Sequence, residues 1–355
     1  MTTRIDLRGL LPEELAQLAA ELGEAPYRGR QLFHWLHRRR ATMLEAMTDL
    51  PRTFRSRLAG QAGLPPVEVV NRRVADGGLT RKLLLRLADG ELIECVLMSY
   101  EDGRQRQTAC LSSQVGCAMG CTFCATGQDG FRRNLTPGEI VLQALALVED
   151  MQLQDPEARL SNIVFMGMGE PLLNYRAVLK AVRIFAHPEG WGISHRRITI
   201  STCGLVPQIR QLAGEKPPLE LAVSLHAATN ELRERLMPIN RRYPLEELVP
   251  ACRHYGQVTG RRVTFEYALI AGINDRREDA RRLVELLQGV LAFVNLIPLN
   301  PVPGSPYKGV SRAKARLFAS WLQRAGLAAA VRESRGQDIA AACGQLRSNA
   351  GREVF

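Results

Sequence analysis

The sequence contains no long hydrophobic run. No stretch approaches the roughly 18 apolar residues that a membrane-spanning helix needs, although hydrophobic residues make up 46% of the 355-residue chain. The first residues, MTTRIDLRGLLPEEL, place charges inside any candidate apolar stretch of a signal peptide. The chain also lacks sequence repeats and low-complexity tracts. These absences predict a globular protein that does not insert into a membrane, and we expect it in the cytoplasm.

Cysteine and acidic residues are also scarce. There are eight cysteines, and because a cytosolic protein keeps its thiols reduced, they indicate metal binding or catalysis rather than a disulfide framework. Asp and Glu number 36 against 47 Lys and Arg, which gives a net charge of +11. A basic surface predicts a polyanionic partner, RNA or DNA rather than membrane. A merely solvated basic surface in an Arg-rich protein is the alternative.

Residues 1–60 are predicted to form a small helical domain. The segment LLPEELAQLAAELG has apolar residues at helical spacing and ends at Gly23, and LPRTFRSRLAG predicts another short helix. Between them, YRGRQLFHWLHRRR interleaves aromatic side chains with the basic residues Arg28, Arg30, His34, His37, Arg38, Arg39 and Arg40. We expect an RNA-binding basic face here. The alternative is a packed bundle whose arginines only face water.

The remaining chain changes its period twice. Residues 61–104, which include VEVVNRRVADGGLTRKLLLRLADGELIECVLM, have the turns and alternation of a β-meander. In residues 105–355, amphipathic helices separate most of the strand candidates 108–113, 162–168, 197–202, 219–225, 262–270, 292–299 and 329–333. Repeated βα units imply a parallel sheet. Six or so units fit a barrel or partial barrel, with its chemistry at the C-terminal ends of the strands.

Three cysteines are concentrated in CAMGCTFC, in a loop after the first of these strands. Cys117, Cys121 and Cys124 suit a metal or cluster, whereas a zinc finger usually needs four ligands in two pairs. A four-iron cluster held by three cysteines leaves one iron without a protein ligand, which a reactive site can use. The spacing C-x3-C-x2-C, with Phe123 before the last cysteine, resembles the signature of radical S-adenosylmethionine (SAM) enzymes. A three-cysteine zinc site completed by a distant His or Cys is the alternative.

That resemblance implies a SAM site on the later loops. MGMGEP (166–171) looks like the glycine-rich element that holds the amino end of SAM, where Gly167 and Gly169 allow close backbone approach and Glu170 accepts from the ammonium. Residues at the ends of later strands are expected to contact the carboxylate, ribose and adenine of SAM: Ser201, Ser224, Leu225, His226 and Asn300. A purely structural His226 is the alternative.

Longer motifs narrow the resemblance. CLSSQVGCAMGCTFCATGQDGFRRNL, MGMGEPLLNY, SLHAATNELRERLMPIN and RGQDIAAACGQL together resemble the RlmN/Cfr family, the radical-SAM adenosine methyltransferases of 23S rRNA and tRNA, over nearly the whole chain. The resemblance implies an α/β fold: a partial (β/α)6 radical-SAM barrel with the helical domain and the meander before it. It implies a [4Fe-4S] cluster and SAM, used twice per turnover. Expected partners are 23S rRNA, tRNA and an electron donor such as flavodoxin or ferredoxin, with no DNA, for a monomeric enzyme.

The resemblance also gives roles to isolated residues. Cys343 in AACGQL matches the methyl-carrying cysteine, and Cys110 matches the cysteine that resolves the covalent adduct. Glu94 falls where the family has its acid/base carboxylate, although Cys95 replaces a common Thr and a few extra residues follow. The three remaining cysteines match no family role and are expected to be structural: Cys95, Cys203 and Cys252.

The implied reaction needs each of these groups. Cys343 takes a methyl group from SAM, and a radical derived from a second SAM removes a hydrogen from it. The resulting carbon radical adds to the adenine ring, one electron leaves, and a base removes the ring proton. Cys110 then attacks the sulfur of Cys343. Methylated RNA leaves, and reductant must reopen the resulting disulfide. We expect carbon 2 of adenosine as the target. The alternatives are a resistance-type carbon-8 methyltransferase, another radical-SAM reaction, and a zinc-containing RNA-binding module.

Overall fold

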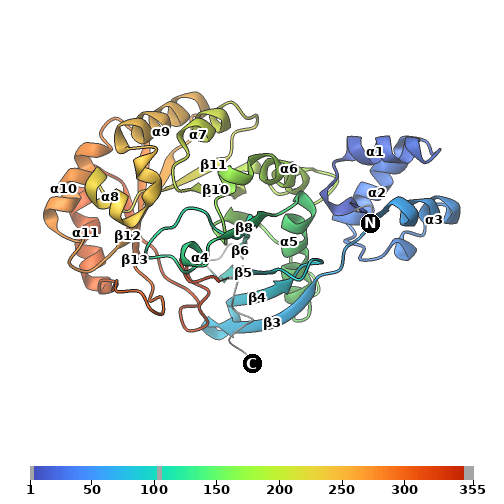
Figure 1. Cartoon of the computed structure of the whole chain (residues 1–355), viewed down its shortest axis with the longest axis horizontal. Helices are drawn as coiled ribbons and strands as arrows, with labels where there is room; N and C mark the ends of the chain where they lie inside the picture. The colour runs from blue at the N-terminus through green and yellow to red at the C-terminus, as the bar shows by residue number, and fades with distance from the viewer. Residues whose placement is uncertain (1–3, 102–105, 348–355) are drawn as a thin grey trace.

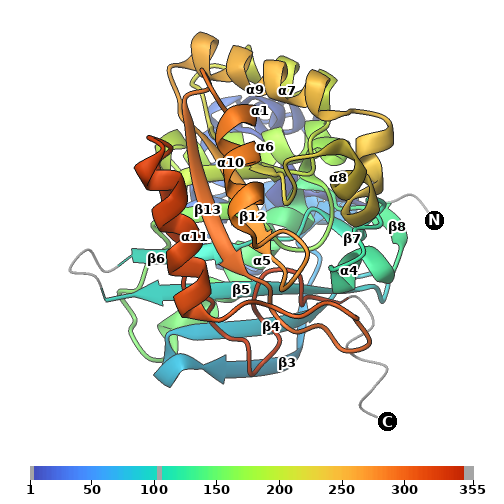
Figure 2. The ribbon, with the colours of Figure 1, turned by 90° about the vertical axis from the view of Figure 1, so that its left-hand side faces the viewer.

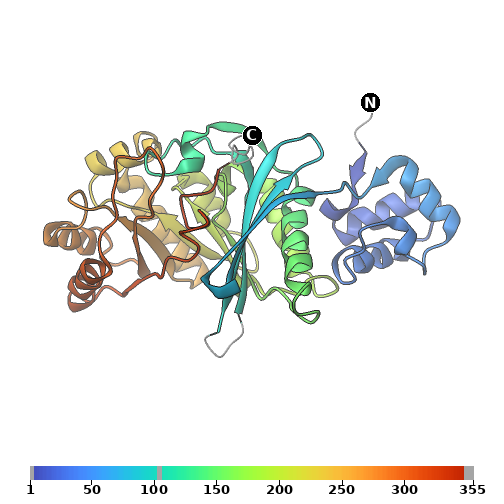
Figure 3. The same ribbon diagram turned by 90° about the horizontal axis from the view of Figure 1, so that it is seen from below.

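The computed structural model describes residues 4–101 and 106–347. Its N-terminal part consists of three helices, as predicted: α1 (Pro12–Glu21), α2 (Tyr27–His37) and α3 (Arg52–Gln61). A short parallel pair, β1 (Ile5–Asp6) and β2 (Ala62–Gly63), brings the two ends of this part together. Figure 1 and Figure 3 show the three helices as a compact group set to one side of the larger sheet-containing part.

The helical part is fixed to the rest of the chain by close packing and by ion pairs. A Cβ on Gly9 would lie 2.8 Å from the backbone nitrogen of Gly138, so two glycines allow the backbones to approach. Nearby, Lys180 pairs with Glu14 at 2.6 Å and Arg183 pairs with Glu13 at 2.7 Å. The acidic start of α1 therefore faces the larger part of the molecule.

The predicted basic face of α2 is smaller than the sequence indicated. His37 is buried, and burial, with smaller effects from Arg8 and His187, lowers its pKa to about 3. It is therefore neutral and contributes no positive charge. Arg39 instead lies over the ring of Trp35, with its guanidinium carbon 4.2 Å from the ring centroid. Arg30 pairs with Glu189 at 2.5 Å.

A ten-stranded sheet is the centre of the rest of the molecule. Its antiparallel portion contains β3 (Glu68–Ala75), β4 (Thr80–Arg86) and β5 (Leu92–Tyr100). Its parallel portion contains β6 (Arg106–Cys110), β9 (Asn162–Phe165), β10 (Ile198–Thr202), β11 (Glu220–Ser224), β12 (Val263–Leu269), β13 (Ala292–Pro298) and β14 (Ala329–Val331). The meander is continuous with the parallel strands, because β5 pairs with β6. Figure 2 shows β3, β4 and β5 below β12 and β13.

Helices cover the outer face of the parallel strands and connect them. They are α5 (Pro137–Gln152), α6 (Tyr175–Ala186), α7 (Val206–Ala213), α8 (Asn230–Leu236), α9 (Leu245–Thr259), α10 (Arg277–Leu286) and α11 (Arg312–Arg324). Six βα units followed by β14 form an open barrel wall, which confirms the predicted fold class. The division at residues 60 and 104 stays a prediction. Among the described helices, none combines the length and apolar character needed to cross a membrane.

The first barrel strand ends earlier than predicted. The sequence predicted a strand over residues 108–113, but β6 ends at Cys110. Beyond it, the hydroxyl of Ser112 donates to the carbonyl of Glu94 at 2.6 Å and accepts from the backbone N–H of Met168 at 2.8 Å. Gln143 of α5 bonds both backbone groups of Ser112. These side-chain bonds turn the chain out of the sheet and toward the cysteine loop.

Candidate active site

The cysteine loop owes its shape to glycines. After β7 (Gln114–Gly116), Gly116 has a φ of +73°. A Cβ on Gly116 would lie 1.9 Å from the carbonyl oxygen of Gly130, so no other residue fits. The N–H of Cys117 donates to that same oxygen at 2.8 Å. The loop then passes Cys121 and Cys124 into the short helix α4 (Ala125–Gln128).

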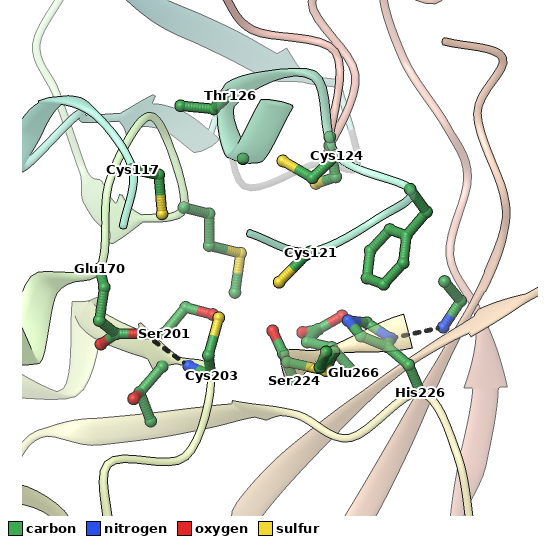
Figure 4. A pocket seen from close by; sticks show the side chains of 18 of the residues that line it. Cys117, Cys121, Cys124, Thr126, Glu170, Ser201, Cys203, Ser224, His226 and Glu266 are labelled. Atoms are coloured by element: carbon green, nitrogen blue, oxygen red, sulfur yellow. Dashed lines mark hydrogen bonds between the residues drawn. The ribbon is translucent and has the colours of Figure 1, made fainter. Parts of the chain in front are cut away.

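The three predicted metal ligands line one cavity at the C-terminal ends of the barrel strands. Figure 4 shows the thiols of Cys117, Cys121 and Cys124 around this cavity. The cavity encloses about 950 Å³ of space when the open solvent at its mouth is included. Among the described residues, no three His, Cys, Asp or Glu side chains converge closely enough to hold a single metal ion. A multi-iron cluster instead takes each thiolate on a different iron, so this spread of ligands fits it.

Burial in the loop favours the protonated form of two of these thiols. Burial is the largest effect, and it raises the pKa of Cys117 to about 12 and that of Cys124 to about 11. Both therefore carry protons at neutral pH, and iron must displace those protons to bind thiolate. The donor set is consistent with an iron–sulfur cluster.

The glycine-rich loop after β9 forms the adjoining wall. Gly169 has a φ of +97°, and a Cβ there would lie 2.6 Å from the Cβ of Gln114. The carboxylate of Glu170 accepts from the backbone N–H of Cys203 at 2.6 Å and from that of Leu172 at 3.0 Å. Burial raises the pKa of Glu170, while these hydrogen bonds oppose the rise. The side chains of Thr202 and Cys203 also hydrogen-bond this carboxylate, which therefore lies on the cavity wall as an acceptor within a polar network.

The next strands place Ser201, Ser224 and His226 on the same cavity, as predicted. The Nδ1 of His226 accepts from the N–H of Ala268 at 2.9 Å, and burial, together with Arg233, lowers the pKa of His226 to about 3. The ring is therefore neutral, and its proton is on Nε2, which makes it a donor. Leu225 differs, because its side chain is fully buried in the core. At this strand end, neighbouring side chains point to opposite sides.

Cys343 reaches the same cavity from the far end of the chain. It lies in a stretch, residues 332–347, that has neither helix nor strand. The N–H of Ala125 in α4 donates to the carbonyl of Gly344 at 2.8 Å, and the hydroxyl of Thr126 donates to that of Leu346 at 2.6 Å. The side-chain amide of Asn300 donates to the carbonyl of Cys343 at 3.0 Å. Asn300 lines the cavity but also holds this stretch in place.

A second cavity places Cys110 beside Cys343. Cys343 and Asn300 line both this cavity and the first one. Burial, and then the proximity of Cys343, raises the pKa of Cys110 to about 12, while Arg332 lowers it. All eight cysteines are free thiols in the structure. Cys110 and Cys343 are thus neighbours without a bond between them.

Glu94 does not line either of these cavities. Its carboxylate faces a third one, where it pairs with Lys82 at 2.8 Å and accepts from the N–H of Arg347 at 2.9 Å. Burial raises the pKa of Glu94, and Lys82 opposes that rise. The structure therefore brings Glu94 close to the Cys343 stretch but not to the cysteine cluster.

Three ionisable residues that line the first cavity were not foreseen as site residues: Cys203, Glu266 and Arg332. Cys203 was expected to be structural, as Cys95 and Cys252 are, but it follows the end of β10 and its thiol faces the cavity (Figure 4). Glu266 is buried within β12, where Asn295 donates to its carboxylate at 2.9 Å. The proximity of Cys343, more than that of Glu266, raises the pKa of Arg332. The signal for Glu266 was a charged residue within an apolar strand, and the signal for Arg332 was a charged residue directly after one.

The comparisons with known proteins agree with this arrangement. Residues 111–284 match the family model of the radical SAM superfamily, and residues 5–64 match that of the ribosomal RNA large subunit methyltransferase N-terminal domain. The chain is 73% identical, over all of both chains, to a probable dual-specificity RNA methyltransferase RlmN of Moorella thermoacetica. It is 50% identical to the protein of the same name from Heliobacterium modesticaldum, covering 97% of this chain and 90% of that one.

A solved structure extends the match to three dimensions. A radical SAM methyltransferase from Sphaerobacter thermophilus superposes with a TM-score of 0.92 at 50% identity, over 97% of this chain and 99% of that one. Radical SAM enzymes use a [4Fe-4S] cluster and SAM, and these are the cofactors of this enzyme. Three cavity-lining thiols next to a glycine-rich loop and a buried carboxylate fit both groups. The chain therefore belongs to the RlmN family of radical-SAM dual-specificity RNA methyltransferases.

Proposed function

We propose that this enzyme methylates carbon 2 of adenosine in 23S rRNA and tRNA, and that Cys343 carries the methyl group. The observation that carries the proposal is the place of Cys343, which lines both the cavity of the three cluster cysteines and the cavity of Cys110. One sulfur with access to both cavities can receive a methyl group on one side and meet a resolving thiol on the other.

The residues of the first cavity bind the cofactors in this proposal. Cys117, Cys121 and Cys124 hold the cluster, which with SAM supplies the radical chemistry that activates a methyl group. Glu170 accepts from the ammonium of SAM, and Gly169 lets the backbone approach it. Ser201, Ser224, Asn300 and the Nε2–H of His226 supply polar contacts for the remainder of SAM.

Cys110 and Glu94 complete the reaction. Cys343 first attacks the electrophilic methyl of SAM as a nucleophile. After the carbon radical has added to adenine and one electron has left the adduct, Glu94 takes the ring proton. Cys110 then attacks the sulfur of Cys343, and the RNA leaves with the carbon while a disulfide forms. The raised pKa of Cys110 means that it stays protonated until this step, and Arg332, which lowers that pKa, supplies a positive charge beside the forming thiolate.

The RNA partner explains the basic composition. Phosphates of rRNA and tRNA match a net charge of +11, and the target adenine must leave its stack to reach a cavity. As part of the same proposal, the enzyme works as a cytoplasmic monomer, and flavodoxin or ferredoxin reduces it.

Nucleoside mass spectrometry tests the proposal. Reconstituted enzyme is incubated with SAM, reductant and unmodified 23S rRNA or tRNA, and the digested RNA is compared with standards. We expect 2-methyladenosine in both RNAs and none with the Cys343→Ala variant. An 8-methyladenosine product would assign the enzyme to the resistance-type reaction instead. SAM cleavage without either nucleoside would overturn the proposed target.

A further inference from the structure

The stretch that carries Cys343 has no regular structure of its own to hold it. Its backbone makes no helix or strand between residues 332 and 347, yet a methyl carrier must present one sulfur at a defined place. We call residues 336–347 the Cys343 segment. In Figure 1 and Figure 2 the end of the chain, in red, runs between the barrel strands and β3–β5. Its position must therefore be set by contacts with other parts of the chain.

Two buried side chains of the meander make such contacts. Lys82 lies on β4 and Glu94 on β5. They are diagonal neighbours on the strand pair, because Lys82 is opposite Val96 and Leu84 is opposite Glu94. Their charged ends are 2.8 Å apart, with side chains only 7% and 2% exposed. Few lysine and glutamate side chains are buried this far unless they are paired.

Each member of this pair also binds the Cys343 segment. The ammonium of Lys82 donates to the carbonyl of Ala340 at 3.0 Å. The second oxygen of Glu94 accepts from the backbone N–H of Arg347 at 2.9 Å. These two contacts lie three residues before Cys343 and four residues after it. The pair thus holds the segment on both sides of the sulfur.

A hydrophobic pair would be the simpler solution for stability alone. Burying two opposite charges costs desolvation that their attraction barely offsets, and apolar replacements are often neutral or stabilising. Backbone N–H and C=O groups, however, offer nothing for an apolar side chain to bind. Lys82 donates and Glu94 accepts, so together they match one carbonyl and one N–H at fixed points of the segment. This directional match sets the register of the segment.

We propose that Lys82 and Glu94 are an anchor pair that fixes the position of Cys343 between the two cavities, and that Lys82 is a positioning residue for methyl transfer to Cys343. This inference rests on the proposed role of Cys343 as methyl carrier. Anchors on both sides of Cys343 restrict its sulfur to movements within the reach of one side chain. Such small movements are enough for the sulfur to reach either cavity, because Cys343 lines both of them.

The test uses full-length enzyme and three variants of β4. Lys82→Met removes the ammonium but keeps a flexible apolar stem, and Lys82→Arg restores a positive donor. Arg86→Met is the matched control, because Arg86 lies on the same strand and is exposed, with its own partner Glu68. Two quantities are measured for each: hydrogen exchange in peptides covering residues 340–347, and the initial rate of Cys343 methylation by SAM, followed by peptide mass spectrometry. Iron content is measured alongside.

We expect Lys82→Met to raise the exchange rate of the segment about tenfold or more, because it loses a charge-assisted hydrogen bond. Cys343 methylation should slow about tenfold at saturating SAM, with the KM for SAM and the iron content unchanged. Lys82→Arg should recover most of both effects, and Arg86→Met should show neither. If Lys82→Met does not fold, Lys82→Gln, which keeps a neutral donor, replaces it with the same expected direction.

Two results would overturn the inference. One is exchange in the segment that does not change in Lys82→Met. The other is faster exchange with an undiminished rate of Cys343 methylation, which would make the pair merely structural. Failure of the proposed function would look different. If the wild-type enzyme never methylates Cys343, the carrier role is wrong, while the exchange data still decide whether Lys82 anchors the segment.

Discussion

Two walls of the same cavity hold cysteines by opposite means. The cluster loop carries Cys117, Cys121 and Cys124 within eight residues, and its shape comes from local glycines and from backbone bonds such as that between Cys117 and Gly130. The Cys343 segment has local turns too, such as the bond from the N–H of Ala341 to the carbonyl of Gly336, but these do not attach it to the sheet. It is tied by side chains from β4, β5, α4 and the loop after β13. The first wall is shaped mainly by neighbours in sequence, whereas the second is also held by residues up to 260 positions away.

That difference matches the proposed roles of the two walls, which are to hold a cluster and to carry a methyl group. A cluster needs ligands at fixed places throughout the reaction, and a short glycine-shaped loop provides them. A methyl carrier must serve two cavities, so it benefits from a segment held at separate points with a free sulfur between them. The two designs should therefore respond differently to substitution.

The largest expected effect is on iron content, which should depend on the cluster loop and not on Cys343. Cys121→Ala should abolish iron binding and with it RNA methylation, because three thiolates are the whole protein ligand set proposed for the cluster. Cys343→Ala should keep full iron and sulfide content while abolishing RNA methylation. Iron and acid-labile sulfide assays on anaerobically reconstituted protein check both. Iron lost from Cys343→Ala would break the comparison.

The next effect tests the local shape of the cluster loop. Gly116→Ala should destabilise the protein by about 3 kcal/mol or more, because the new Cβ clashes with a backbone oxygen and the residue must also adopt a left-handed conformation. Gly130→Ala is the matched control in the same loop. Gly130 has a φ of +76° and open space around it, so its substitution should cost only about 1 kcal/mol.

Chemical denaturation of the iron-free variants measures both costs, and iron uptake shows whether the loop still forms. Equal losses for the two alanines would mean that the close contact at Gly116 is relieved by movement of the loop, and that the wall is less rigid than its backbone bonds imply.

The same contrast explains how much the sequence could predict. The three ligands, Gly169 and Glu170 were predicted because their motifs are short and local, and parallel strands bring all βα loops to one end of the sheet. The parallel sheet followed from βα alternation. The residues around Cys343 could not be predicted in this way, because Lys82 in TRKLLLR has no local signal for a contact with Ala340.

Two side chains point away from the surface that the sequence indicated, for equally physical reasons. Leu225 was predicted at the site with its neighbours, and its contact with SAM stays a prediction, but strand alternation turns its side chain into the core. His37 was predicted on a basic face because it lies among arginines, but its ring packs against Phe33 with centroids 4.5 Å apart. In both, a residue was assigned with its neighbours, although its side chain points the other way.

A smaller effect concerns the imidazole beneath the cluster loop, where His226 packs edge-on against Phe123 with centroids 4.9 Å apart. The pKa of His226 is about 3 in the folded protein, against about 6.5 in an unfolded chain. As pH falls below 6.5, the unfolded chain therefore takes up a proton that the folded protein does not, and stability is lost. The loss is about 1.4 kcal/mol per pH unit, or about 2 kcal/mol at pH 5.

Denaturation of iron-free wild type and His226→Gln at pH 6.5 and 5 measures this term. The raised pKa values of Glu170 and Glu266 act in the opposite direction in both proteins, so only the difference between the two proteins is informative. We expect the wild type to lose about 2 kcal/mol more than the variant over this interval. An equal loss would mean that the ring becomes accessible to water and protons below the loop.

The smallest effect tests the bond that joins the two walls. Thr126 in α4 is buried, and its hydroxyl donates to the carbonyl of Leu346. Thr126→Val keeps the shape but leaves that carbonyl without its donor, which should weaken the hold on the Cys343 segment by about 1 kcal/mol. Exchange in residues 340–347 should then rise about fivefold, less than in Lys82→Met, with unchanged iron content. If Thr126→Val instead lowers iron content, the Cys343 segment supports the cluster loop, and the two walls are one unit rather than two.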